Sequence, residues 1–144
     1  MSTYKIIIDM DTINRYNKYY FDLHPKAKKS PISKPYHPSI NTWCILPRLQ
    51  MNSLKQKWKE FGCWWIKEIG LANMLLDVFD MECTTFFDTK RRHDVDNQVP
   101  KFILDSFTAS KFIVDDDEKH LRSLTLKTGY DKNNPRTEIN IITR

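Results

Sequence analysis

The sequence predicts an α+β domain of mixed α/β character, in which two main helices pack on one mixed β-sheet. Several stretches alternate apolar and polar residues, which is typical of half-buried strands. Two other stretches repeat apolar residues every three or four positions, as amphipathic helices do. With 144 residues, of which 40% are hydrophobic, the chain has the size of one domain. We therefore expect a single domain over residues 1–144.

The first forty residues predict one strand followed by irregular chain. Residues 4–9 (YKIIID) are short, β-branched and apolar, and they predict a strand. Residues 11–20 are polar and aromatic, and we interpret them as a hairpin arm or the start of a long loop. Four prolines and four lysines follow, so we expect an exposed basic loop or arm over about residues 22–40. Its lysines and tyrosines suit phosphate contacts and base stacking, although a plain basic linker has the same composition.

The first predicted helix begins after residue 53. Ser53 followed by Gln56 fits a capping box. Apolar residues then recur at helical spacing, and Gly70 is a natural stop. The residues of this stripe are Leu54, Trp58, Phe61, Trp65 and Ile69. We expect the tryptophans of this helix to belong to the core rather than to a stacking surface.

Four further stretches predict strands. Residues 75–87 alternate over a long distance, and residues 111–114 are short and apolar. Residues 121–130 alternate again, and residues 138–143 close the chain after a polar turn. Between the first two of these strands the period changes to that of a helix, with Asp96 or Asn97 as its cap and Pro100 in its first turn.

Charge is distributed unevenly along the chain. The formal net charge is +5, and residues 15–59 hold ten Lys or Arg against one acid. Residues 77–96 hold six acids against three bases. A basic region beside an acidic focus suits a polyanion-binding protein with a metal site, although a basic solvated surface gives the same count.

Other features exclude some classes of protein. The three cysteines form no C-x-x-C pair, so we expect reduced, buried thiols and no zinc site. No apolar run approaches the roughly 20 residues that span a bilayer, and the first residues do not resemble a secretory signal. We therefore expect a cytoplasmic protein without membrane contact.

The candidate site is an acidic constellation around residue 95. Asp94 and Asp96 lie at positions i and i+2, where side chains of an extended chain share one face. The second acidic cluster, residues 115–118, would join them if its strand neighbours the long strand. Carboxylates around one point are ligands for Mg²⁺ or Mn²⁺. The same pattern also fits a plain turn and helix cap, with Lys101 paired to Asp105.

Residues 91–118 (RRHDVDNQVPKFILDSFTASKFIVDDDE) resemble the core signature of the RusA family of Holliday-junction resolvases. The family pattern is a basic run, then Asp-x-Asp-Asn, then a helix carrying Lys and Asp, then an apolar strand ending in Asp-Asp. Residues 38–41 weakly resemble the family's N-terminal Pro-Ser-Asn motif. The matching positions are Arg91, Arg92, Asp94, Asp96, Asn97, Lys101, Asp105, Asp115 and Asp116.

The resemblance implies a homodimeric, Mg²⁺-dependent endonuclease that cuts four-way DNA junctions symmetrically during recombination and repair. Asp94, Asp96 and Asp116 would bind the metal, and Lys101 would complete the catalytic set. The expected DNA-binding residues are Lys55, Lys59, Lys90, Arg91 and Arg92.

The chain departs from the family at one place. The family has its lysine three residues after the asparagine, whereas Lys101 is four residues after Asn97, with Pro100 ahead of it. Two alternatives therefore stay open: a DNA-binding module without nuclease activity, and a metal-dependent nuclease that acts on flaps or single strands.

Overall fold

A four-stranded mixed β-sheet organises the fold in the computed structural model, which describes all 144 residues. The strands are β1 (Thr3–Asp9), β2 (Phe79–Phe87), β3 (Leu121–Tyr130) and β4 (Arg136–Thr143), and their order in the sheet is β1-β4-β2-β3. Strand β4 is antiparallel to both β1 and β2, whereas β2 and β3 are parallel. The predicted α+β class with a mixed sheet is confirmed.

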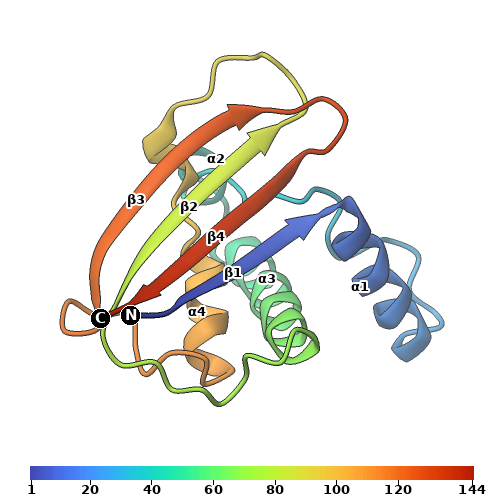
Figure 1. Ribbon diagram of the computed structural model, residues 1–144. Coiled ribbons are helices and arrows are strands. Elements are labelled where there is room, and N and C mark those ends of the chain that lie inside the picture. The colour runs from blue at the N-terminus through green and yellow to red at the C-terminus, as the bar shows by residue number, and fades with distance from the viewer.

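The helices are α1 (Met10–Leu23), α2 (Ile40–Trp43), α3 (Arg48–Glu68) and α4 (Lys101–Ala109), with a 3₁₀ turn, η1 (Val95–Gln98). Helices α3 and α4 lie against one face of the sheet, and α1 lies beside the end of β1 (Figure 1). Both termini lie at the same end of the sheet in that view. No helix has the length and apolar character that crossing a bilayer requires.

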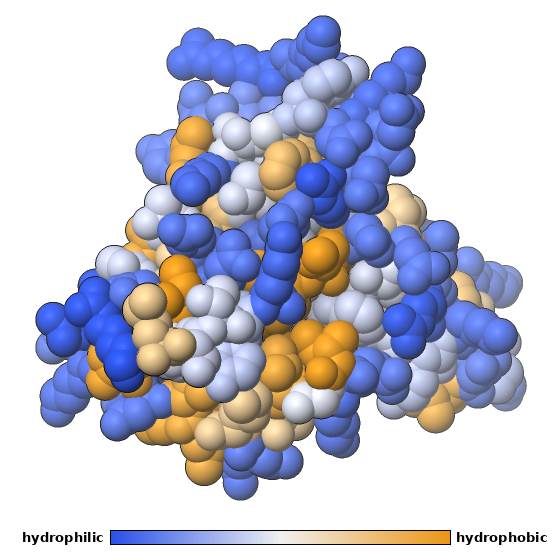
Figure 2. Space-filling view, viewed as in Figure 1, coloured by the Kyte–Doolittle hydropathy of each residue, from blue (hydrophilic) through white to orange (hydrophobic).

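Alternating burial explains how the strands pack. In β2 every second residue from Phe79 to Phe87 is buried beneath the helices. The core is one cluster of 19 buried residues, with Ile139 and Ile141 of β4 fully enclosed. The other face of the sheet has no helix over it and is mostly hydrophilic, with separate apolar patches (Figure 2).

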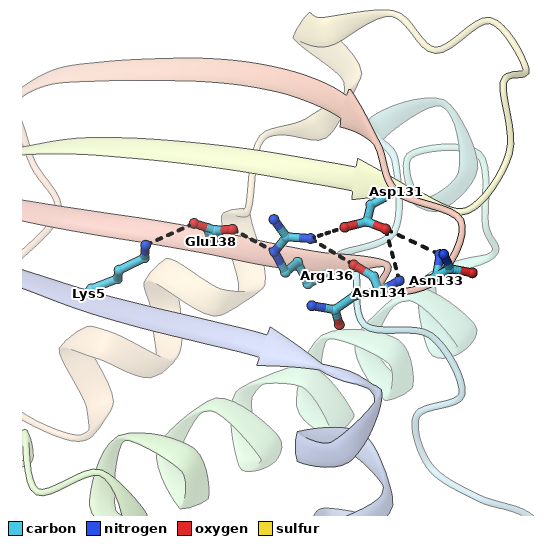
Figure 3. A network of polar contacts seen from close by, with 6 residues as sticks. All are labelled: Lys5, Asp131, Asn133, Asn134, Arg136 and Glu138. Atoms are coloured by element: carbon cyan, nitrogen blue, oxygen red, sulfur yellow. Dashed lines mark hydrogen bonds and ion pairs between the residues drawn. The ribbon is translucent and has the colours of Figure 1, made fainter.

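A polar network spans this open face (Figure 3). Arg136 is bonded to Glu138 at 2.6 Å and to Asp131 at 2.8 Å, and its guanidinium lies 4.0 Å from the ring centroid of Phe86. Lys5 of β1 reaches Glu138 at 3.2 Å. These contacts tie β1, β4 and β2 together where no helix covers them.

Residues 11–20 form part of α1, so the hairpin or loop predicted there is wrong. The carboxylate of Asp9 accepts a hydrogen bond from the Thr12 backbone, and the Thr12 hydroxyl lies near the Asp9 backbone, which makes a capping box. Ile13 and Tyr16 are buried one helical turn apart. The tyrosines favour strands by propensity, but burial of this face against α3 overrides that preference.

Helix α3 begins one and a half turns before the predicted capping box. It starts at Arg48 after Pro47, and Gln56 donates to Glu60 rather than capping the helix. The predicted end is confirmed, because the helix stops at Glu68 and Gly70 adopts a φ of 77°.

Helix α4 begins at Lys101, not directly after Asp96 or Asn97 as predicted. The residues before it form η1, and Val99 is extended with φ −65° and ψ 121°. A residue before proline is disfavoured in the helical region, so Pro100 separates the two helical segments.

The strand predicted over residues 111–114 is reduced to a single bridge. Ile113 pairs in parallel with Leu76 at one position only. Lys111 has a φ of 60° and Leu75 a φ of 51°, and neither value is compatible with an extended strand. The long strand predicted from residue 75 therefore begins at Phe79.

The proline-rich segment is docked against the domain over residues 31–38, so the exposed arm predicted there is wrong. Thr137 donates to the carbonyl of Pro35 at 2.7 Å, and the side chain of Asn17 donates to that of Ile32 at 3.0 Å. Ile32 and His37 are only 4% and 5% exposed. Prolines suppress any period in the sequence, so this burial has no pattern that could be recognised.

Helices α3 and α4 meet at a glycine. Gly62 and Ser106 are both buried, and a Cβ on Gly62 would lie 2.5 Å from the Cβ of Ser106 and closer still to its hydroxyl oxygen. Neither helix can separate without opening the core, since Phe61 and Phe107 beside the contact are also buried. The glycine therefore fixes how closely α4 packs on α3.

We predict that Gly62→Ala lowers the free energy of unfolding by about 2–3 kcal/mol, because steric overlap outweighs the gain in helix propensity. Urea denaturation measures this change. In Gly62→Ala/Ser106→Gly the overlap is removed, so the double variant should be more stable than the sum of the single effects by more than about 1 kcal/mol. Ser53→Ala, on the exposed face of α3, is the control. Strict additivity would contradict this explanation.

Candidate active site

Residues 91–118 occupy the connection between β2 and β3. Because these two strands are parallel, the chain must cross from the end of one to the start of the other, and η1 and α4 supply that crossover. The basic run follows the end of β2, Lys101 begins α4, and the second acidic cluster precedes β3. The topology thus folds all parts of the sequence motif into one connection.

Lys101 lies between two carboxylates. Its Nζ is 3.8 Å from Oδ1 of Asp105 and 3.8 Å from Oδ2 of Asp116. The lysine side chain is 52% exposed, whereas those of Asp105 and Asp116 are 22% and 23% exposed. Lys101 thus contacts the second acidic cluster, and the i, i+4 pair with Asp105 that we considered as an alternative is present as well.

The three aspartates of the second cluster have different partners. The carboxylate of Asp115 accepts from the backbone N–H of Asp116 at 2.8 Å. Asp117 accepts from the backbone of Lys119 and pairs with Nδ1 of His120. Asp115 and Asp117 therefore stabilise the turn, and Asp116 is the residue whose carboxylate faces Lys101.

Electrostatics distinguishes Asp116 from its neighbours. Partial burial raises the pKa of Asp116, Lys101 opposes this rise, and the nearby carboxylate of Asp105 adds to it. The Asp117 carboxylate raises the pKa of His120, and His120 lowers the pKa of Asp117 in return. Asp116 is thus poorly solvated and gains from a neighbouring cation.

Asp94 and Asp96 stand apart from this group. Both are exposed, Asp94 pairs with Arg92 at 3.5 Å, and the side chain of Asp96 has no hydrogen bond or ion pair. The structure does not join them to Lys101 or Asp116, and no three His, Cys, Asp or Glu side chains form a group that could hold a metal ion. The side chains of Asp94, Asp96 and Asp116 suit a hard cation by their chemistry, because every donor atom is a carboxylate oxygen.

The expected DNA-binding residues lie in two places. Lys90, Arg91 and Arg92 are exposed in the connection after β2, with Lys90 5.2 Å from the ring centroid of Tyr130. Lys55 is exposed on α3, whereas Lys59 lines a cavity between α1 and α3. The acidic residues of the candidate site do not border that cavity.

His37 holds the start of α4 and was not predicted from the sequence. Its Nε2 accepts from the backbone N–H of Phe102 at 2.9 Å, and its Nδ1 lies 2.7 Å from the carbonyl of Pro38. The ring packs against Phe102 and Trp58, with centroids 4.9 and 5.6 Å apart. Pro100 offers α4 no side-chain cap, so the imidazole satisfies a free N–H next to Lys101.

A second aromatic contact orders the chain just before the acidic pair. The ring of His93 stacks on Phe87 at the end of β2, with centroids 3.5 Å apart. Tyr36 packs on Phe87 as well and donates to Asp88 at 3.0 Å. The docked proline-rich segment thus contacts the chain on both sides of the acidic pair, at Asp88 before it and at Phe102 after it.

Comparisons with known proteins identify no family for the chain. No protein-family model and no curated protein matches the chain.

We predict that His37 makes the free energy of unfolding decrease as the pH is lowered. Burial lowers the pKa of His37 to about 4, so the folded protein resists protonation where an unfolded histidine, with its ordinary pKa near 6.5, takes up a proton. The stability contribution is complete above pH 6.5 and is lost as pH falls towards 4. Over that window the wild type should lose on the order of 3 kcal/mol more than His37→Gln.

Urea unfolding at several pH values measures this difference. His24→Gln is the control, since His24 is exposed and the same change there should leave the wild-type pH dependence. Equal slopes for the wild type and His37→Gln would contradict a neutral, buried His37.

Proposed function

We propose that this chain is a RusA-like, Mg²⁺-dependent endonuclease that cuts four-way junctions or related branched DNA during recombination and repair. The observation that carries the proposal is the contact of Lys101 with Asp116 at 3.8 Å, within the connection that also holds Asp94 and Asp96. A cation beside a poorly solvated carboxylate, in a connection that also carries two exposed acids, suits catalysis on a phosphodiester.

Each acidic residue has a role in this proposal. Asp94, Asp96 and Asp116 would hold Mg²⁺, with Mn²⁺ as a substitute. When bound, the metal supplies a Lewis acid and lowers the pKa of a coordinated water. Lys101 binds a phosphate oxygen and offsets its charge, and Asp105 orients the lysine from the next turn of α4.

The surroundings of the site fit a polyanion. Lys90, Arg91 and Arg92 are exposed directly before the acids and contact the DNA backbone without reading its sequence. Lys55 and Lys59 form a second basic group on α3. A two-fold homodimer would present two such sites to a two-fold junction, and the protein would act in the cytoplasm.

We predict that purified protein cleaves a labelled four-way junction in the presence of Mg²⁺. Asp116→Asn and Asp96→Asn should reduce the cleavage rate by about a hundredfold or more, because each loses a charged ligand. Glu118→Gln is the matched control, since it lies in the same acidic cluster, is exposed and has no ion pair. It should cleave as the wild type does.

The outcomes separate this function from its alternatives. Faster cutting of a flap than of a junction would favour a nuclease of broader specificity. Junction binding without cleavage would favour a DNA-binding module and would overturn the proposed activity. A monomer in sedimentation at micromolar concentration would contradict the symmetric dimer.

We also predict that Mg²⁺ stabilises the protein without DNA. A ligand that binds only the folded state at about 100 times its Kd adds about 2.7 kcal/mol to stability. The wild type and Glu118→Gln should therefore melt several degrees higher in saturating Mg²⁺, whereas Asp116→Asn should show little change. Thermal denaturation with and without the metal measures this shift. An equal response of Asp116→Asn would exclude Asp116 as a ligand.

A further inference from the structure

The largest cavity of the protein lies away from the candidate active site. It has a volume of about 620 Å³ and lies between α1 and α3, closed at one side by residues 109–111. Lys101 begins α4 and these residues follow its end, so the length of the helix, about 13 Å, separates the two places. The proposed nuclease chemistry makes no use of this cavity.

Aromatic side chains form one wall of the cavity. Tyr19 of α1 and Trp64 of α3 lie with ring centroids 5.7 Å apart and planes inclined by 31°, and the ring centroids of Tyr16 and Trp64 are 5.2 Å apart. Tyr16 is buried, but Tyr19, which also lines the cavity, is 44% exposed. An accessible aromatic face of this kind stacks well with a planar ring.

Three lysines line the same cavity. Lys59, Lys67 and Lys111 line the cavity, and none of them forms an ion pair in the structure. Glu60 is the one acid among the lining residues, and its carboxylate accepts a hydrogen bond from Gln56. The cavity therefore combines a stacking surface with an excess of positive charge.

Lys111 is held in an unfavourable backbone conformation. Its φ is 60°, in the left-handed region that glycine adopts most easily, at the position where a helix end usually has glycine. Asn73, which also lines the cavity, has a φ of 65° and donates its N–H to Ser110. A glycine at position 111 would end α4 equally well and without strain. The chain has a lysine there instead, so the strained backbone accompanies the lysine side chain.

From these features we propose that the cavity binds a nucleotide, with its base stacked on Tyr19 and Trp64 and its phosphate held by Lys59, Lys67 and Lys111. An aromatic ring joined to an anion matches both the wall and the charge. The source of the nucleotide is either a free mononucleotide or one unit of a single strand. The proposal does not depend on the nuclease activity, because it needs no metal and shares only Lys59 with the residues assigned to the nuclease.

Isothermal titration without divalent metal tests the site. The probes are deoxyadenosine monophosphate, a tetradeoxyadenylate, and the two halves of the ligand, deoxyadenosine and inorganic phosphate. We expect saturable binding of the mononucleotide, and at least about tenfold weaker binding of either half, since each half makes only part of the contacts. Tighter binding of the tetranucleotide would identify a single strand as the source, and equal binding would identify a free nucleotide.

Variants locate the binding to this cavity. Lys111→Gly should weaken mononucleotide binding by about tenfold while its melting temperature stays equal or rises, because the substitution removes a charge and relieves strain. Tyr19→Leu should weaken binding similarly through the lost stacking. Lys132→Gly, which removes an exposed lysine outside the cavity, is the control and should bind as the wild type does.

The proposal is overturned by either of two results. One is the lack of saturable binding of both the mononucleotide and the tetranucleotide up to about 10 mM, a concentration at which even weak ligands bind. The other is wild-type affinity in both Lys111→Gly and Tyr19→Leu.

Discussion

The candidate site depends on the contacts of the buried His37 imidazole. This imidazole joins the proline-rich segment to Trp58 of α3 and to the backbone of Phe102 in α4. Helix α4 has no cap of its own, because Pro100 precedes it and supplies no side-chain acceptor. A neutral imidazole is needed here, since a protonated ring would offer no lone pair to the Phe102 N–H. The start of α4, where Lys101 lies, is thus held by a residue that is far away in the sequence.

The crossover between β2 and β3 explains why distant parts of the motif meet. A parallel pair of strands requires the chain to return along the sheet, and α4 makes that return on the covered face. The loop after α4 then runs back beside Leu76, which brings Asp116 alongside the first turn of the helix. Contacts of this kind follow from topology, and no spacing in the sequence specifies their distance.

Alternation and helical period predicted the elements that bury one face. The strands over residues 121–130 and 138–143 and the helix ending near Gly70 follow directly from those patterns. Helix α1 was missed because its tyrosines favour strands locally, and the docking of residues 31–38 was missed because prolines carry no period. For the site, the sequence placed the acids and Lys101 in one region. It could not reveal that Asp115 and Asp117 serve the turn, since that depends on His120 and on backbone N–H groups.

Helix α4 is held at three points, and each of them costs stability locally. His37 is buried without charge at the start of α4. Gly62 of α3 faces the middle of α4, in place of a better helix former. Lys111 adopts a left-handed backbone after the end of α4. A helix that served only to cover the sheet would need none of them, because its apolar face alone supplies the packing. Backbone strain and buried polar groups persist where the surrounding structure enforces them, and they gather at functional sites. The three costs therefore argue that the exact placement of α4 matters, and its two ends carry Lys101 and Lys111 respectively.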